Sequence, residues 1–126
     1  MRYLGAAGLA LLALLAGCGR PEAKLAPVQG RVFYRGRPLA GGTIVFTPDA
    51  DRGGSGPLAC GEVGPDGHYT LHTGDEPGAV PGWHKITVAG ARGDRLLPRK
   101  YSDPEASGQG REVKAGQTNS LDLDLE

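Results

Sequence analysis

Cys18 is the residue of this chain whose setting points most directly to a chemical role. It closes the tetrapeptide LAGC at 15–18, which ends an apolar stretch that begins just after Arg2. A charged start, a short hydrophobic run and small residues before a cysteine are typical of a secretory signal specialised for lipid attachment. An uncleaved membrane helix is the alternative, but residues 4–15 are only about a dozen, whereas a bilayer needs about 20. The sequence therefore predicts an exported and processed chain.

The segment at 15–18 resembles the lipobox of bacterial lipoproteins. In that family the cysteine sulfur receives a diacylglyceryl group, the signal is cut before the cysteine, and the new amino terminus is usually acylated. The resemblance implies a signal peptide at 1–17, a lipid-bearing Cys18 and a short tether at 18–27. Gly19, rather than an aspartate, follows the cysteine, which by resemblance to enteric lipoproteins favours the periplasmic side of the outer membrane.

Length and charge limit the remaining possibilities. Removal of 1–17 would leave about 109 residues, enough for one small domain, which we place at 28–126. Fourteen basic and fourteen acidic side chains balance, so we expect no nucleic-acid partner. If Cys18 carries lipid, Cys60 has no partner in its own chain for a disulfide. A cysteine in a strand-like segment is more often a small buried hydrophobe than a reactive thiol, so Cys60 is expected to be buried and inert.

The placement of the 22 glycines and 10 prolines predicts an all-β domain. They lie between short runs of alternating apolar and polar residues, as turn residues do. We expect seven strands, at 28–34, around 44–48, and at 58–63, 68–73, 82–89, 111–114 and 118–125. Short strands with one-sided hydrophobicity predict a two-sheet antiparallel sandwich. No segment after the signal shows helical periodicity.

Turns and loops between these strands can also be predicted. Residues 64–67, GPDG, have the chemistry of a tight turn, which predicts a hairpin between the third and fourth strands. The glycine-rich stretch 49–56 is expected to be a mobile loop and 90–110 a long irregular connection. In the last strand we expect leucines inside and acids outside: Leu121, Leu123 and Leu125 against Asp122, Asp124 and Glu126.

Short motifs follow one another in a fixed order along this domain: Gly30-x-Val32, Gly36-x-Pro38-Leu39, Ile44-x-Phe46-x-Pro48, Asp66-Gly67-x-Tyr69-x-Leu71, Pro81-Gly82-x-His84-x-Ile86-x-Val88, Pro98-x-Lys100-Tyr101 and a closing Leu-x-Leu pattern. With them the chain resembles the carboxypeptidase regulatory-like, or transthyretin-like, domain of many bacterial lipoproteins. The resemblance implies a seven-stranded Greek-key sandwich. In the carboxypeptidases this module is an accessory to a catalytic domain, and we expect no catalytic domain beside it in this chain.

The residues that could support catalysis or bind a metal have simpler explanations. His68 and His72 share a strand face, but on a straight strand they lie about 13 Å apart, whereas zinc ligands lie about 2 Å from the metal. One of them could still meet ligands from elsewhere, and His84 is expected inside. The acids of the last strand diverge at about 6.6 Å spacing, so a solvated face is favoured over a calcium site. No serine stands in a Gly-x-Ser-x-Gly elbow. We therefore expect no enzyme, metal or cofactor.

Two functions remain for the domain. The first is a non-catalytic, membrane-anchored lipoprotein with a structural or partner-binding role in the cell envelope. The alternative is a carbohydrate- or peptidoglycan-binding module, which typically needs exposed aromatic platforms; Trp83, Phe33 and Tyr101 are the candidates, and parity places Trp83 outward. The basic loop at 92–100 could instead touch anionic lipid or polymer. The expected partners are membrane lipid, through Cys18, and an envelope glycan or protein.

Overall fold

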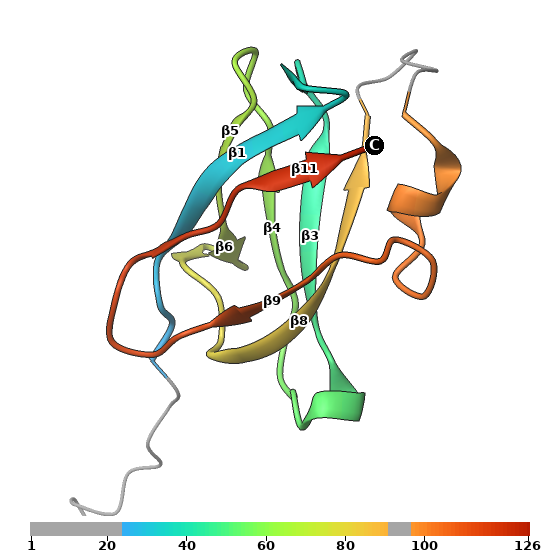
Figure 1. Cartoon of the computed structure of the whole chain (residues 1–126). Helices are drawn as coiled ribbons and strands as arrows, with labels where there is room; N and C mark the ends of the chain where they lie inside the picture. Colours follow the sequence, from blue (N-terminus) through green and yellow to red (C-terminus); the bar gives the residue numbers. More distant parts are fainter. Residues whose placement is uncertain (1–23, 91–96) are drawn as a thin grey trace, which may run out of the picture.

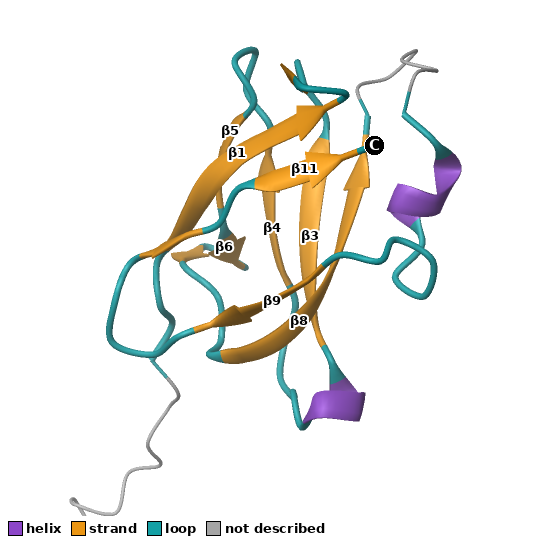
Figure 2. Ribbon diagram, viewed as in Figure 1, coloured by secondary structure: helices purple, strands orange, loops and turns teal. Residues whose placement is uncertain are grey.

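Two β-sheets pack against each other in the computed structural model, which describes residues 24–90 and 97–126 (Figures 1 and 2). The larger sheet is antiparallel throughout and has the order β7-β6-β4-β3-β8-β9. Its strands are β3 (Thr43–Pro48), β4 (Ala59–Glu62), β6 (His72–Thr73), β7 (Glu76–Pro77), β8 (Gly82–Ala89) and β9 (Gly110–Val113). The expected all-β class is confirmed. The expected signal segment at 1–17 and Cys18 lie outside the described residues.

The smaller sheet is built around β1 (Val28–Tyr34) and is mixed. On one side β1 pairs in parallel with β10 (Asn119–Ser120) and β11 (Leu123–Leu125). On the other side it pairs antiparallel with β2 (Arg37–Pro38) and β5 (His68–Thr70). The expectation of a wholly antiparallel sandwich is therefore wrong, because the carboxy-terminal strands run in the same direction as β1. The described residues form eleven short strands rather than seven.

The core lies between the two sheets and follows the alternation read from the sequence. In β3, Ile44 and Phe46 are fully buried, while the residues beside them are half-buried. Ile86 in β8, Val32 in β1 and Leu123 in β11 are also fully buried. Because strand side chains alternate between faces, each strand contributes every second residue to this core. Burial of these apolar side chains is the main source of stability.

The turn at 64–67 forms, but the predicted hairpin does not. Gly64 donates its N–H to the His68 carbonyl at 2.8 Å, and Gly67 donates to the Gly64 carbonyl at 3.0 Å. The turn leads from β4 in the larger sheet to β5 in the smaller one. The predicted strand 68–73 is split at Leu71, which is buried and donates its N–H to Val28. The chain therefore changes sheets at Leu71, and His72 returns to pair with β4.

The predicted last strand is also divided, between β10 and β11. The backbone N–H of Arg31 in β1 donates to Oδ1 of Asp122 at 2.9 Å. The Asp122 side chain therefore takes the place of the backbone carbonyl that would accept this hydrogen bond in a continuous strand. Leu123 and Leu125 are nevertheless buried, and the neighbouring acids Asp122 and Asp124 are exposed. The predicted burial is confirmed for Leu123 and Leu125 and the predicted exposure for the acids, whereas Leu121 is only half-buried and the strand is interrupted.

The two long connections contain short 3₁₀ turns. The stretch expected as a mobile loop begins with η2 (Ala50–Arg52), which Asp49 caps by accepting the Asp51 N–H at 3.0 Å. Gly53 ends η2 in the left-handed conformation, with φ of 80°. The connection expected to be irregular contains η3 (Arg99–Ser102). Along the chain, η2 follows β3 and η3 follows β8.

The chain joins the sandwich before β1 begins. Ala26 is 2% exposed and exchanges two backbone hydrogen bonds with Ala79, at 2.9 and 3.0 Å. The described end of the segment expected to be a short tether, 18–27, is therefore packed against the domain. In Figure 1 this junction and η2 lie at the same, lower end of the molecule.

Candidate functional site

The candidate site is a shallow groove of about 230 Å³ beside Trp83. It is bounded by the first residues of β8, by η2 and by the loop before β9. His84, the residue after Trp83, and Ile86, two positions further on, are buried in the core. Because side chains alternate between the faces of a strand, Trp83 points outward. The groove therefore lies on the outer face of the larger sheet.

Asp49 fixes the position of η2 over the start of β8. Its N–H donates to the Trp83 carbonyl at 2.8 Å, and its carboxylate caps η2. This arrangement carries Arg52, the last residue of η2, over the indole, with its guanidinium carbon 4.2 Å from the ring centroid. A cation at this distance over a tryptophan face is attracted by the ring quadrupole. The expected outward direction of Trp83 is correct, but the indole is half-buried and one face is covered by Arg52.

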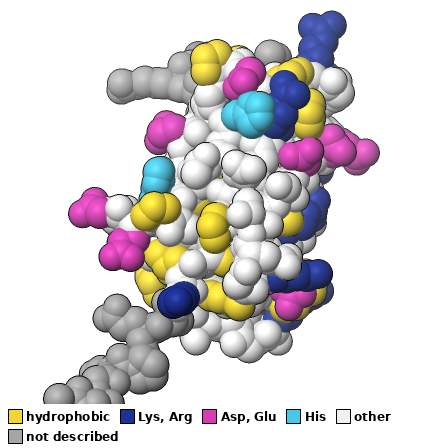
Figure 3. All heavy atoms as spheres, turned by 90° about the vertical axis from the view of Figure 1, so that its left-hand side faces the viewer, with side chains coloured by type: hydrophobic (Ala, Val, Ile, Leu, Met, Phe, Trp, Pro, Cys, Tyr) yellow, Lys and Arg dark blue, Asp and Glu magenta, His cyan; other side chains and the backbone are white. Residues whose placement is uncertain are grey.

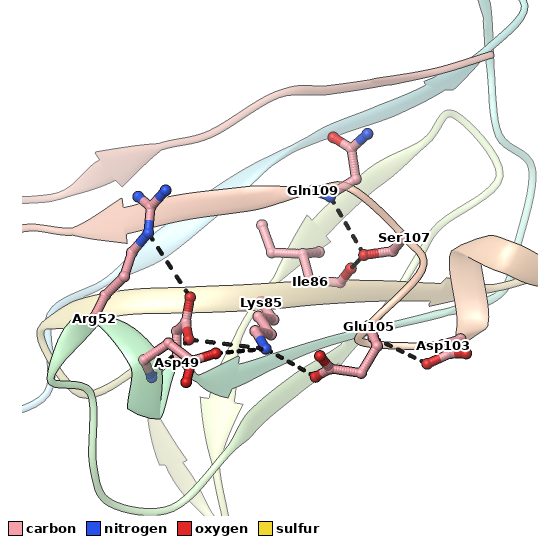
Figure 4. A network of polar contacts seen from close by, with 9 residues as sticks. Asp49, Arg52, Lys85, Ile86, Asp103, Glu105, Ser107 and Gln109 are labelled. Atoms are coloured by element: carbon pink, nitrogen blue, oxygen red, sulfur yellow. Dashed lines mark hydrogen bonds and ion pairs between the residues drawn. The ribbon is translucent and has the colours of Figure 1, made fainter.

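Lys85 is the centre of a charged network at the floor of the groove (Figure 4). Its Nζ lies 2.8 Å from Glu105 Oε2, 3.5 Å from Asp51 Oδ2 and 3.9 Å from Asp49 Oδ1. The hydrogen bond to Glu105 is the largest cause of the raised pKa of Lys85. The three carboxylates come from two segments, Asp49 and Asp51 from η2 and its cap and Glu105 from the loop before β9, so Lys85 connects both segments to β8.

Ser107 fastens the loop that forms the far wall of the groove. Its hydroxyl is buried, donates to the Ile86 carbonyl at 2.6 Å and accepts the Gln109 N–H at 3.3 Å. The Ile86 N–H in turn donates to the Gln109 carbonyl at 2.9 Å. One turn earlier, Asp103 accepts the N–H of Glu105 at 2.9 Å. Figure 4 shows these contacts holding Glu105 in place toward Lys85.

Tyr101 is not the exposed platform that we expected. It is 3% exposed, and its hydroxyl donates to the Glu126 carbonyl and accepts the Glu126 N–H, both at 2.8 Å. The reason is η3, which turns the ring inward against the core. Phe33, the other aromatic candidate, is half-buried, with the Arg31 guanidinium 5.2 Å from its centroid.

A second groove, of about 400 Å³, brings both exposed histidines to one surface of the molecule, where Figure 3 shows histidine side chains in cyan. Its lining includes His68, His72 and Glu62. His68 Nδ1 lies 2.8 Å from Asp66 Oδ2, and this hydrogen bond lowers the pKa of Asp66. The separation expected for the two histidines assumed a straight strand, whereas the chain changes sheets at Leu71. Within residues 24–90 and 97–126, no group of three or more His, Cys, Asp or Glu is arranged to hold a metal ion.

The two other side chains expected inside the domain have opposite outcomes. His84 is 1% exposed, packs against Phe46 with ring centroids 5.6 Å apart, and shares a 2.8 Å hydrogen bond between Nε2 and the Val80 carbonyl. Cys60 is exposed, so its expected burial is wrong. Its neighbours Ala59 and Gly61 occupy the inward positions of β4, which places the thiol on the outer face.

The sequence did not single out the charged residues that shape the groove. The residues Asp49 and Gly53 on either side of η2 are typical of a capped turn, and this signal could have located Arg52. No local pattern relates Lys85 to its partners, because Asp51 and Glu105 are 34 and 20 residues away along the chain. Their proximity is a product of the tertiary fold.

Comparison with family models, curated proteins and solved structures finds no match to this chain. In the part of the chain that the structure describes, no helix has both the length and the apolar character needed to cross a bilayer. The proposed lipid-bearing Cys18 and two arginines of the basic loop, Arg92 and Arg95, lie outside the described residues.

Proposed function

We propose that this protein is a non-catalytic lipoprotein of the cell envelope, anchored through lipid on Cys18, whose β-sandwich binds a partner close to the membrane. The observation that carries the proposal is that the chain already packs against the sandwich at Ala26, before β1 begins. Seven residues, 19–25, would separate the anchor from the sandwich. Fully extended, they reach about 25 Å. A tether of this length keeps the domain beside the bilayer that holds the lipid.

A binding role is supported by how the polar groups at the Trp83 groove are used. Lys85, Ser107 and Asp49 bond to neighbouring protein groups, which fixes the shape of the groove. Rigid walls around a partly exposed aromatic side chain suit recognition on a surface, where loops carried by a β-scaffold commonly provide the contacts.

A carbohydrate- or peptidoglycan-binding module is the second candidate. The observation in its favour is that Trp83 borders the same groove as Glu105 and Gln109. An indole offers area for stacking, and carboxylate and amide oxygens accept hydrogen bonds from sugar hydroxyls. A sugar ring on the indole would first have to displace Arg52.

Detergent partitioning of cysteine variants tests the anchor. The native protein, expressed in a bacterium that processes lipoproteins, is expected to enter the detergent phase, and Cys18→Ser is expected to remain in the aqueous phase. Cys60→Ser is the matched control, because it removes the other cysteine of the chain and should partition as the native protein does. Membrane fractionation of Cys18→Ser indistinguishable from that of the native protein would reject lipid anchoring at this residue.

Tryptophan fluorescence tests the glycan alternative, since Trp83 is the single tryptophan of the chain. The full-length protein in non-ionic detergent is titrated with soluble peptidoglycan fragments. A saturable change in emission supports the alternative if Trp83→Phe also loses binding in a parallel assay that does not use tryptophan fluorescence. Unchanged emission up to millimolar fragment rejects a glycan site at this groove.

A further inference from the structure

We propose that the Trp83 groove receives a basic side chain, arginine or lysine, from a partner protein, and that this side chain takes the place of Arg52 on the indole. The inference rests on the proposed partner-binding function and names the chemistry of the partner. It uses the same groove between η2, β8 and the loop before β9.

Arg52 already demonstrates which group the indole accepts. Its guanidinium carbon lies 4.2 Å from the ring centroid of Trp83. Apart from the ring, the described structure holds this guanidinium by one ion pair, to Asp49 at 3.9 Å, and the Arg52 side chain is 56% exposed. A contact of this length to one carboxylate is weak. Arg52 can therefore leave the ring at small cost and expose a face suited to another cation.

The charges around the ring favour a cationic guest. Asp49, Asp51 and Glu105 face two cations, Lys85 and Arg52. The Asp51 and Glu105 side chains are 85% and 76% exposed, so both keep oxygen lone pairs open to solvent. A guest guanidinium or ammonium would restore the positive charge that leaves with Arg52 and would add hydrogen bonds to these carboxylates.

The size of the groove also suits one side chain. Its volume of about 230 Å³ lies below the range of roughly 300–1,000 Å³ that is usual for small-molecule pockets. Gly108 and Gly110 form low walls on one side, which lets an extended segment approach the ring closely. A neutral sugar would fill the same space but would leave the surplus of carboxylates without a compensating charge.

Fluorescence titration of the full-length protein in non-ionic detergent tests the proposal. The probe is acetyl-Gly-Arg-Gly-amide, and its control is the same peptide with citrulline, which has nearly the shape of arginine and no charge. We expect saturable binding of the arginine peptide, weakened by added salt, and weaker binding of the citrulline peptide. Arg52→Ala should tighten binding of the arginine peptide by about two- to fivefold, the size of an exposed cation–π contact.

Charge variants separate a specific site from general attraction to acids. Asp51→Asn should weaken binding by about two- to fivefold, as expected for an exposed ion pair. Asp124→Asn, which removes an exposed carboxylate from β11, is the matched control and should leave binding unchanged. Arg52→Gln serves in place of the alanine variant if that variant does not fold, and the same gain in affinity is expected.

Three results would overturn the proposal: weaker rather than tighter binding by Arg52→Ala, equal affinity for the citrulline peptide, or emission that does not respond to the arginine peptide. A saturable response to chitotriose under the same conditions, with none to the peptide, would assign the groove to glycan. Lipid anchoring is measured separately on Cys18→Ser, so failure of this site and failure of the proposed anchor are distinguishable.

Discussion

The hydroxyl of Tyr101 bonds to both backbone groups of Glu126, donating to the carbonyl and accepting the N–H, each at 2.8 Å. Tyr101 belongs to η3, which packs on β8 of the larger sheet, whereas Glu126 directly follows β11 of the smaller one. One side chain therefore connects the two sheets along an open side of the sandwich. In Figure 1, η3 and the end of β11 lie on the same side of the molecule.

Tyr101→Phe should lower the free energy of unfolding by about 1–3 kcal/mol. The substitution keeps the buried ring but leaves the part-buried N–H and carbonyl of Glu126 without this partner, and an unsatisfied polar group costs about that much. Urea denaturation followed by circular dichroism measures the change. Tyr34→Phe, on a half-buried tyrosine of β1, is the control and should change stability less. Equal effects of the two variants would show that the bonds to Glu126 contribute little.

Gly67→Ala should destabilise the domain more than Gly36→Ala. Both glycines have positive φ, 88° and 79°, so an alanine is strained at either position. A Cβ at Gly67 would also lie 2.9 Å from the Val32 carbonyl oxygen, whereas a Cβ at Gly36 would meet nothing within 4 Å. We expect a loss of about 1 kcal/mol at Gly36 and about 2–3 kcal/mol at Gly67. Equal midpoints of thermal unfolding would mean that the close approach at Gly67 relaxes freely.

Local sequence patterns predicted the buried side of β3, β8 and β11 but not that of β4, and they did not predict which sheet a strand joins. Alternation in 68–73 continues through Leu71, so it predicts one strand, while the structure divides this segment between two sheets. The parallel pairing of β1 with β11 depends on contacts such as Arg31 with Asp122, 91 residues apart. Alternation within a strand contains no information about such pairings.

The same distinction explains the candidate site. Strand parity placed Trp83 outward, because the buried residues of β8 occupy the other face. Parity also places Cys60 outward once Ala59 and Gly61 are known to face inward. All three residues are small, so their side chains did not indicate in the sequence which face of β4 is buried. Tyr101 is buried because of a partner 25 residues later in the chain. Lys85 likewise holds the groove together through carboxylates that are distant in the sequence, and no local motif predicts these contacts.

Gly30→Ala should be strongly destabilising, by about 3 kcal/mol or more. A Cβ at this position would lie 2.0 Å from the Leu121 carbonyl oxygen, and this neighbour is backbone rather than a flexible side chain. The substitution would therefore push β1 away from the segment between β10 and β11. Gly64→Ala is the control, since its Cβ would keep 3.4 Å or more from other atoms. Chemical denaturation of both variants tests this; a native midpoint for Gly30→Ala would contradict the close approach of these strands.

Tyr69 should make the domain less stable at alkaline pH. Burial is the main cause of the raised pKa of this phenol, whose hydroxyl donates to the Leu121 carbonyl. The unfolded chain loses the Tyr69 proton above the ordinary value of 10.0, while the folded protein retains it. The unfolded state then binds fewer protons, so stability is fully present below about pH 10 and falls by up to about 1.4 kcal/mol per pH unit above it.

Tyr69→Phe should therefore flatten the alkaline part of the curve of unfolding free energy against pH. The variant loses the hydrogen bond to Leu121 and is expected to be less stable than the native protein at pH 8. Between pH 10 and 12 the difference should shrink, because phenylalanine has no proton to lose on unfolding. Urea denaturation at several pH values measures both curves, and Tyr34→Phe, on β1, controls for the loss of a phenol elsewhere in the domain. Parallel curves for Tyr69→Phe and the native protein would show that ionisation of Tyr69 is not coupled to unfolding.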